Sequence, residues 1–116
     1  MSRGYLLGLD GGSSSTKAVI FDTEGNVMGV GREACRLEHP QAHWVERDMN
    51  AAWASATAAI RGALAAAELD GDEILAVGVT GHGDGLYPID GKGEPLGRAI
   101  TSLDSRAVGM VERWCR

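Results

Sequence analysis

The sequence has little of several things, and each shortage excludes a class of protein. Aromatic residues make up 5% of the chain, so Leu, Val, Ile and Ala must build most of the core. The two cysteines, Cys35 and Cys115, lie far apart and show no C-x-x-C spacing. This excludes a cysteine-rich zinc site and a disulfide framework, and we expect reduced thiols in a cytoplasmic protein.

Positive charge and long apolar runs are also scarce. The chain carries 11 Lys and Arg against 16 Asp and Glu, a net charge of −5, so it has no basic footprint for nucleic acid. No apolar run approaches the roughly 18 residues that cross a bilayer, and the run after Arg3 is too short for a signal peptide. We therefore expect neither a nucleic-acid partner nor a membrane partner. The length of 116 residues suits one small domain.

Glycine is plentiful, and the most informative glycines lie between two short apolar runs near the N-terminus. Residues 5–9 and 17–21 have the length and composition of β-strands. The segment between them reads Asp10-Gly11-Gly12-Ser13-Ser14-Ser15-Thr16. Such a turn can hold a phosphate through N–H and O–H donors, and Asp10 can hold a hard cation through water. A plain hairpin with a Gly/Ser turn is the alternative interpretation.

The middle of the chain predicts one more strand and a long helix. Residues 27–37 read as a third strand, and short turns join it to the first two in an antiparallel meander. Residues 49–69 are Ala-rich and predict a helix, with Asp48 as its N-cap and Gly71 as the residue that ends it. The predicted buried face of this helix consists of Trp53, Ala56, Ile60, Leu64 and Ala67.

Residues 73–80 form a nearly continuous apolar run, which is typical of a strand in a parallel pair. If this fourth strand pairs in parallel with the first, Asp10 and the loop Gly81-His82-Gly83-Asp84-Gly85 emerge at the same edge of the sheet. Ligands of open α/β sheets bind at that edge. Beyond it, we expect a short strand over 86–89 and the opening of a helix over 107–114. The segment 39–47 reads as a loop.

Four stretches, in order, resemble the N-terminal part of the FGGY family of carbohydrate kinases, in the actin-like ATPase superfamily. The first phosphate loop of the family resembles residues 9–17, and its W-x-E-x-D segment resembles residues 43–48. Residues 79–85 lie where these kinases carry a T-G-Q-x-x-G-type sugar loop, and residues 103–107 are similar to a W-x-D-x-R-type segment. The resemblance implies an α/β fold, the actin-like (ribonuclease H-like) N-terminal domain portion. Its sheet is mixed, a three-strand antiparallel meander plus a parallel strand.

The resemblance also implies an ATP- and Mg²⁺-dependent kinase that phosphorylates a sugar or polyol hydroxyl. Asp10 matches the acidic residue near the metal. The implied phosphate contacts are Gly12, Ser13, Ser14, Ser15, Thr16 and Lys17. The implied substrate contacts are His82, Gly83, Asp84, Asp104 and Arg106. For Asp104 and Arg106, pairing with each other or capping of the last helix is the alternative interpretation. The catalytic base of the family is an Asp that we expect beyond residue 116.

Two departures bear on the substrate. Gly83 and Asp84 stand where glycerol kinases have an Arg-Glu pair and xylulose kinases a Met-His pair, and Ser102 replaces a common aromatic residue. The G-H-G-D-G form looks more like the erythritol and L-xylulose kinase branch.

We expect residues 1–116 to be an incomplete first actin-like domain that is inactive alone and self-associates through exposed apolar surface. Two alternatives to the kinase remain. One is a non-catalytic actin-like module that binds a nucleotide or a protein. The other is a different enzyme of the superfamily, such as an acyl-phosphate kinase.

Overall fold

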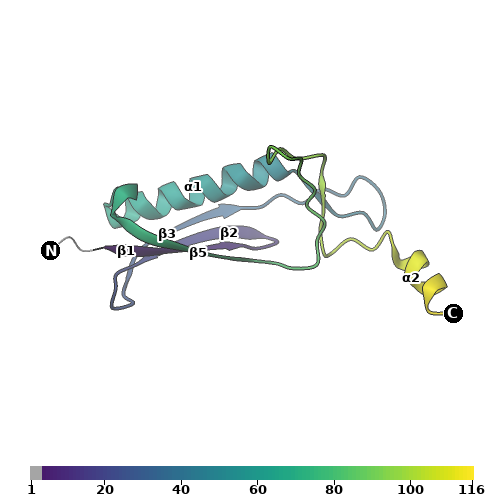
Figure 1. Ribbon diagram of the computed structural model, residues 1–116, viewed down its shortest axis with the longest axis horizontal. Coiled ribbons are helices and arrows are strands. Elements are labelled where there is room, and N and C mark those ends of the chain that lie inside the picture. The colour runs from purple at the N-terminus through teal and green to yellow at the C-terminus, as the bar shows by residue number, and fades with distance from the viewer. Residues whose placement is uncertain (1–3) are drawn as a thin grey trace. The chain divides into compact units, whose positions relative to one another are not determined.

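The computed structural model describes residues 4–116, which divide into two compact units (Figure 1). The first unit combines the chain up to Cys35 with residues 52–82, and the second combines residues 36–51 with residues 83–116. The first unit contains a four-stranded sheet, and the second contains a two-stranded sheet.

The four-stranded sheet confirms the predicted pairing. It consists of β1 (Tyr5–Gly11), β2 (Ser15–Phe21), β3 (Val27–Ala34) and β5 (Ile74–Gly81), in the order β3-β2-β1-β5. β1, β2 and β3 form the antiparallel meander, and β5 pairs in parallel with β1. The third strand ends at Ala34, three residues earlier than predicted. The carboxyl ends of β1 and β5 therefore lie side by side, with Asp10 paired to Thr80.

The helix α1 (Met49–Ala67) packs on one face of this sheet, as Figure 1 shows. Its buried residues are Ala59 and Ala63, which pack with Leu7, Ala18 and Ile20. The predicted helix face is correct at Ile60, Leu64 and Ala67, which pack against this core, but wrong at Trp53, which is 74% exposed.

Two glycines of β3 set which part of α1 faces the sheet. A Cβ atom on Gly31 would lie 1.9 Å from the carbonyl oxygen of Ala59, and one on Gly29 would lie 2.4 Å from that of Ala63. The helix backbone therefore rests directly on the strand at these glycines. This close contact places the small residues Ala59 and Ala63 against the sheet.

The two ends of α1 differ in how well they were predicted. Asp48 is the N-cap as expected, since its Oδ1 accepts a hydrogen bond of 2.9 Å from the N–H of Ala51. Gly71 does not end the helix. Glu68 takes the left-handed conformation with φ of 55°, and the N–H of Leu69 donates to the carbonyl oxygen of Leu64. This is the Schellman arrangement, with Glu68 at the position where glycine is usual.

In the second unit, β4 (Glu46–Arg47) pairs antiparallel with β6 (Ala99–Ile100), and α2 spans Val108–Trp114. The prediction of a loop over 39–47 is thus wrong at its last two residues. The predicted strand over 86–89 is also wrong, because that segment makes only single bridges, from Leu86 to Ile100 and from Ile89 to Pro95. The helix predicted over 107–114 is confirmed.

No helix among residues 4–116 is long and apolar enough to cross a membrane. Several large apolar residues of the sheet are exposed, among them Leu6, Val30, Leu75, Val77 and Val79. Exposed apolar surface was expected, and the self-association inferred from it stays a prediction.

Candidate functional site

The turn between β1 and β2 has the geometry of a small, fixed loop. The N–H of Gly12 donates to the carbonyl oxygen of Ser15 over 3.0 Å, which leaves Ser13 and Ser14 at the tip. A Cβ atom on Gly12 would lie 2.8 Å from that same carbonyl oxygen. The main chain on the two sides of the turn therefore approaches so closely here that glycine is required at position 12. Ser14 is exposed and Ser13 is half-buried, so their N–H and O–H groups are the donors presented by the tip.

Asp10 lies at the carboxyl end of β1, beside this turn. It is exposed, and within residues 4–116 its carboxylate makes no hydrogen bond or ion pair. Lys17 is its cross-strand partner on β2, and Thr80 is its partner on β5. Residues in register lie on the same face of a sheet, so the carboxylate, the ammonium group and a hydroxyl share one face. A carboxylate without a protein partner, close to hydroxyls, suits a hard cation such as Mg²⁺.

Thr16 points the other way from Lys17. Its exposed fraction is 2%, and it lies on the same face of β2 as the buried residues Ala18 and Ile20. The Oγ1 atom of Thr16 lies 3.2 Å from the Sγ atom of Cys35, and either group can donate the hydrogen bond. The main-chain N–H of Cys35 donates to the carbonyl oxygen of Ser14 over 2.9 Å.

A shallow hollow of about 440 Å³ lies on the sheet face that carries Asp10 and Lys17. Its lining is mostly apolar and consists of Gly8, Leu9, Asp10, Lys17, Val19, Phe21, Gly78, Val79 and Thr80. Asp10 and Lys17 are the charged residues of this lining, both near the turn. The charged side chains of the lining thus lie at the end of the hollow next to the carboxyl end of β1.

His82 follows β5 and contacts the phosphate turn directly. Its Nδ1 atom lies 3.0 Å from the carbonyl oxygen of Gly11, and its main-chain N–H donates to the same oxygen over 3.4 Å. Because a carbonyl oxygen only accepts, Nδ1 carries the proton in this contact. The predicted proximity of the first loop and of His82 is therefore confirmed within the first unit.

Asp84 belongs to the second unit and has an unusual backbone. Its φ is 63°, in the left-handed region that few residues other than glycine adopt. It is exposed, and within the described part of the chain its carboxylate accepts no hydrogen bond. A strained residue with an available carboxylate is a common feature of ligand loops. Its role in substrate binding stays a prediction.

Asp104 and Arg106, also in the second unit, bind each other. The guanidinium of Arg106 donates to Oδ2 of Asp104 through Nε at 2.9 Å and Nη2 at 2.7 Å. Oδ2 also accepts the N–H of Val45 at 2.7 Å, and the Asp104 side chain is 3% exposed. The hydrogen bond from Arg106 holds the pKa of Asp104 well below its ordinary value, and the same bond raises the pKa of Arg106.

Two further residues of this network were not among the predicted site residues. Trp44 stacks on Arg106, whose guanidinium carbon lies 3.9 Å from the ring centroid. Glu46 accepts a hydrogen bond of 2.9 Å from Nη2 of Arg106 and also pairs with Arg98. The W-x-E spacing was a usable signal, because both of its named residues contact Arg106. Both side chains hold Arg106 in place.

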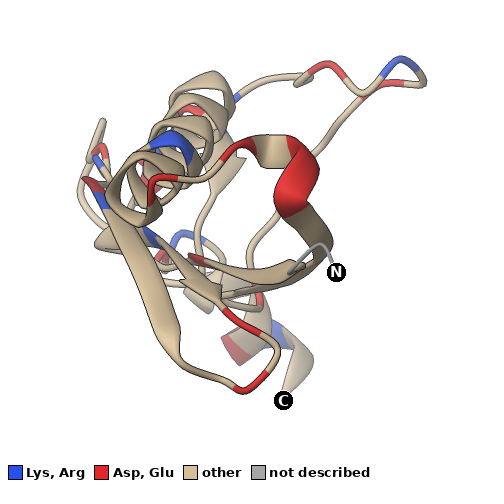
Figure 2. Cartoon of the chain, turned by 90° about the vertical axis from the view of Figure 1, so that its left-hand side faces the viewer, with Lys and Arg blue, Asp and Glu red and all other residues tan. Residues whose placement is uncertain are grey.

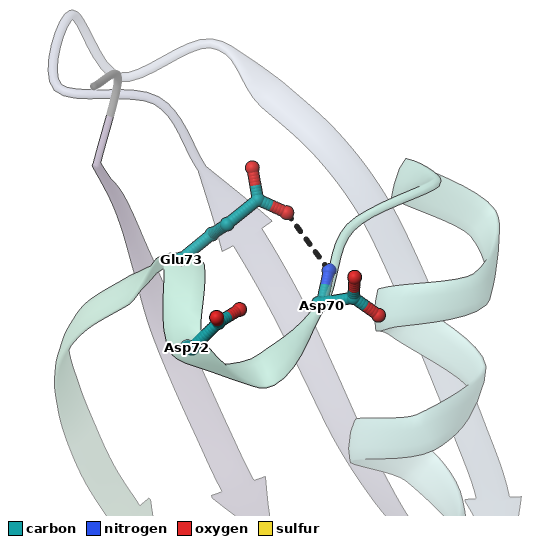
Figure 3. A group of neighbouring side chains, drawn as sticks. All are labelled: Asp70, Asp72 and Glu73. Carbon is teal, nitrogen blue, oxygen red and sulfur yellow. Dashed lines mark hydrogen bonds between the residues drawn. The ribbon is translucent and has the colours of Figure 1, made fainter. Parts of the chain in front are cut away.

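Three exposed carboxylates, Asp70, Asp72 and Glu73, gather at the 3₁₀ turn Gly71–Glu73 before β5 (Figures 2 and 3). One carboxylate oxygen from each residue lies within 4.8 Å of those from the other two. Oε2 of Glu73 accepts a hydrogen bond of 2.9 Å from the N–H of Asp70, as Figure 3 shows. This contact caps the short helical turn, so the cluster has a structural explanation.

Comparison with known proteins connects these features. Residues 5–116 match the profile of the N-terminal domain of the FGGY family of carbohydrate kinases. The chain is 42% identical over 110 residues to an L-xylulose/3-keto-L-gulonate kinase of Escherichia coli, covering 95% of this chain and 22% of that protein. It is 38% identical over 108 residues to a glycerol kinase of Thermococcus onnurineus, covering 93% of this chain and 22% of that protein.

A solved structure gives the same result at the level of the fold. The xylulose kinase of Rhodospirillum rubrum superposes with a TM-score of 0.83 and 25% identity, covering 96% of this chain and 23% of that one. The chain thus spans about a fifth of the length of the relatives it matches. The actin-like fold expected from the resemblance is confirmed.

Proposed function

Because the chain belongs to the FGGY family of carbohydrate kinases, we propose that it forms the first part of a longer enzyme that transfers the γ-phosphoryl group of ATP to a sugar or polyol hydroxyl. The observation that carries this proposal is the pairing of β1 with β5 in parallel. This pairing brings the phosphate turn, Asp10 and His82 to one edge of the sheet.

In this proposal the turn holds the phosphates of ATP. The N–H and O–H groups of Ser13 and Ser14 are placed at the tip of the turn, with Gly12 and Ser15 closing it. Lys17 lies beside Asp10 and adds a positive charge near the same end. Asp10 takes the Mg²⁺ ion, directly or through water. Bound Mg²⁺-ATP supplies the phosphoryl group, and the metal offsets the charge of the phosphates.

The second loop provides the sugar site. We assign His82, Gly83 and Asp84 to substrate hydroxyls, and a carboxylate such as that of Asp84 can accept hydrogen bonds from two of them. We also assign Asp104 and Arg106, in the second unit, to substrate contacts, and each fixes the other. In the reaction, a substrate hydroxyl oxygen bonds to the γ-phosphorus and the bond to the ADP oxygen breaks. The hydroxyl proton passes to a base that we expect beyond residue 116.

The relatives favour a small ketose or polyol as substrate. The 42% identical relative is named for L-xylulose and 3-keto-L-gulonate, and Gly83 and Asp84 differ from the Arg-Glu pair expected of a glycerol kinase. We therefore place L-xylulose and related ketoses first, erythritol second and glycerol last. A cytoplasmic location and reduced Cys35 and Cys115 belong to the same proposal.

The test is ATP consumption by the full-length protein with L-xylulose, erythritol, D-xylulose and glycerol. We expect one strong substrate, and we expect D84N to raise its KM or abolish turnover. D72N is the matched control, because Asp72 is an exposed carboxylate on the 3₁₀ turn before β5. Nucleotide binding without turnover on any sugar would instead favour the non-catalytic binding module.

A further inference from the structure

We propose that Thr16 and Cys35 are positioning residues that hold the phosphate turn from its buried side, and that Thr16 is not itself a phosphate contact. This inference rests on the proposed function of the turn. It divides the hydroxyls of the segment into two groups. Those at the tip face solvent and are available to a nucleotide, whereas that of Thr16 faces the interior.

The burial of Thr16 is the first support. Its exposed fraction of 2% leaves no room for a ligand oxygen beside it, and it shares the inner face of β2 with Ala18 and Ile20. A buried hydroxyl needs a hydrogen-bond partner, since an unsatisfied one is costly. The Sγ atom of Cys35, at 3.2 Å, provides that partner.

Cys35 contacts the turn at a second point. Its main-chain N–H donates to the carbonyl oxygen of Ser14 at 2.9 Å, so the residue just beyond β3 holds two residues of the turn. Ser14 lies at the tip and Thr16 lies in β2, next to the closing residue Ser15. Holding both fixes the direction in which the donors of the tip point. A phosphate site gains affinity when its donors are fixed before the ligand arrives.

Loss of the hydrogen bond between Thr16 and Cys35 should affect the affinity for nucleotide and not the affinity for sugar. Loss of the Thr16–Cys35 hydrogen bond leaves the main-chain bond and the strand pairing in place, so the fold persists. The turn becomes less ordered, and binding must then order it. Nucleotide affinity should fall, whereas sugar affinity, which depends on the loop after β5, should not.

The experiment measures the Kd for ATP and ADP by calorimetry, and the KM for the sugar, in the full-length protein. The variants are T16V, C35A, the double variant and C35S, with C115A as the matched control at the exposed cysteine. T16V keeps the shape of the side chain, and C35S restores a hydrogen-bonding group. Thermal unfolding of each variant shows that it is folded.

We expect T16V and C35A each to weaken nucleotide binding about threefold to tenfold, the range of one hydrogen bond. The double variant should lose no more than the larger single loss, because both remove the same contact. C35S and C115A should bind nucleotide like the unaltered protein, and the sugar KM should not change in any variant.

Three results would overturn the inference: unchanged nucleotide affinity in T16V and C35A, fully additive losses, or equal losses of sugar and nucleotide affinity. Failure of the unaltered protein to bind nucleotide would overturn the proposed function and this inference with it. Binding that is indifferent to both substitutions would overturn the inference alone.

Discussion

The Nδ1 atom of His82 lies 3.0 Å from the carbonyl oxygen of Gly11. These residues are 71 positions apart, and the contact joins the loop that follows β5 to the loop that follows β1. His82 therefore has a structural link to the phosphate turn besides its proposed place in the sugar site.

This link predicts different results for two substitutions at His82. In H82N the side-chain amide can donate where Nδ1 donates, so ATP affinity should stay within about threefold of the original. In H82L no side-chain donor remains, the Gly11 carbonyl keeps only the long main-chain contact, and ATP affinity should fall about tenfold. Calorimetry with ATP measures both. H39N is the control, and equal ATP affinity in H82L and H82N would show that the link is unimportant.

Asp104 predicts a pH dependence of stability. Its pKa in the folded chain is depressed, first by the hydrogen bond from Arg106, from an ordinary value of 3.8. The stabilisation from the ionised carboxylate is therefore complete above pH 3.8 and declines as the pH falls below it, where the unfolded chain takes up the proton first. Urea unfolding from pH 7 to pH 2 measures this decline. D104N should be less stable at pH 7 and should have a shallower acid slope, and an identical slope would contradict the account.

The end of α1 predicts a stabilising substitution. Glu68 holds φ of 55° without the freedom of glycine. E68G should raise the free energy of unfolding by about 0.5–1 kcal/mol, because glycine adopts this conformation without steric cost. Chemical unfolding measures the change. E24G is a control at an exposed turn residue, and destabilisation by E68G would mean that the Glu68 side chain makes a contact that outweighs the strain.

The contact of α1 with β3 predicts a destabilising substitution. A Cβ at Gly31 would collide with the main chain of Ala59, which cannot yield as a flexible side chain can. G31A should therefore lower the free energy of unfolding by about 1–3 kcal/mol or more. G78A is the matched control in a strand of the same sheet, because nothing lies within 4 Å of its added Cβ. Equal stability of the two variants would contradict the close packing described here.

These elements also show what could be predicted from the sequence. The apolar runs at residues 5–9, 17–21 and 73–80 predicted the pairing of the sheet, because strand length and apolar composition are local properties of the sequence. Burial of the last of these strands on both faces, which its apolar run suggests, is wrong, since β5 is mostly exposed within residues 4–116. Trp53 was misplaced because the contact face of α1 depends on Gly29 and Gly31, which are distant in sequence. Two-residue strands such as β4 have no periodicity to detect.

The residues of the candidate site likewise differ in whether local sequence could predict their position. Asp10, the turn and His82 were found together because each lies at or just after the carboxyl end of a strand whose direction could be inferred. The inward direction of Thr16 and its contact with Cys35 could not be foreseen, since the choice of face depends on where α1 packs. The mutual pairing of Asp104 and Arg106 was raised only as one alternative to substrate contact. Two loop residues that lie two positions apart in the sequence have no fixed spatial relation to each other.

The central claim is that the turn and Asp10 bind Mg²⁺-ATP for phosphoryl transfer to a sugar. The most direct test is transfer of labelled γ-phosphate from ATP to L-xylulose or erythritol by the full-length protein, comparing D10N with the unaltered enzyme and with D72N. The account predicts transfer by the unaltered protein and by D72N, and a loss of at least about 100-fold in D10N, the range for removing one electrostatic contact to a reacting phosphate. Transfer by D10N at the rate of the unaltered enzyme would contradict it.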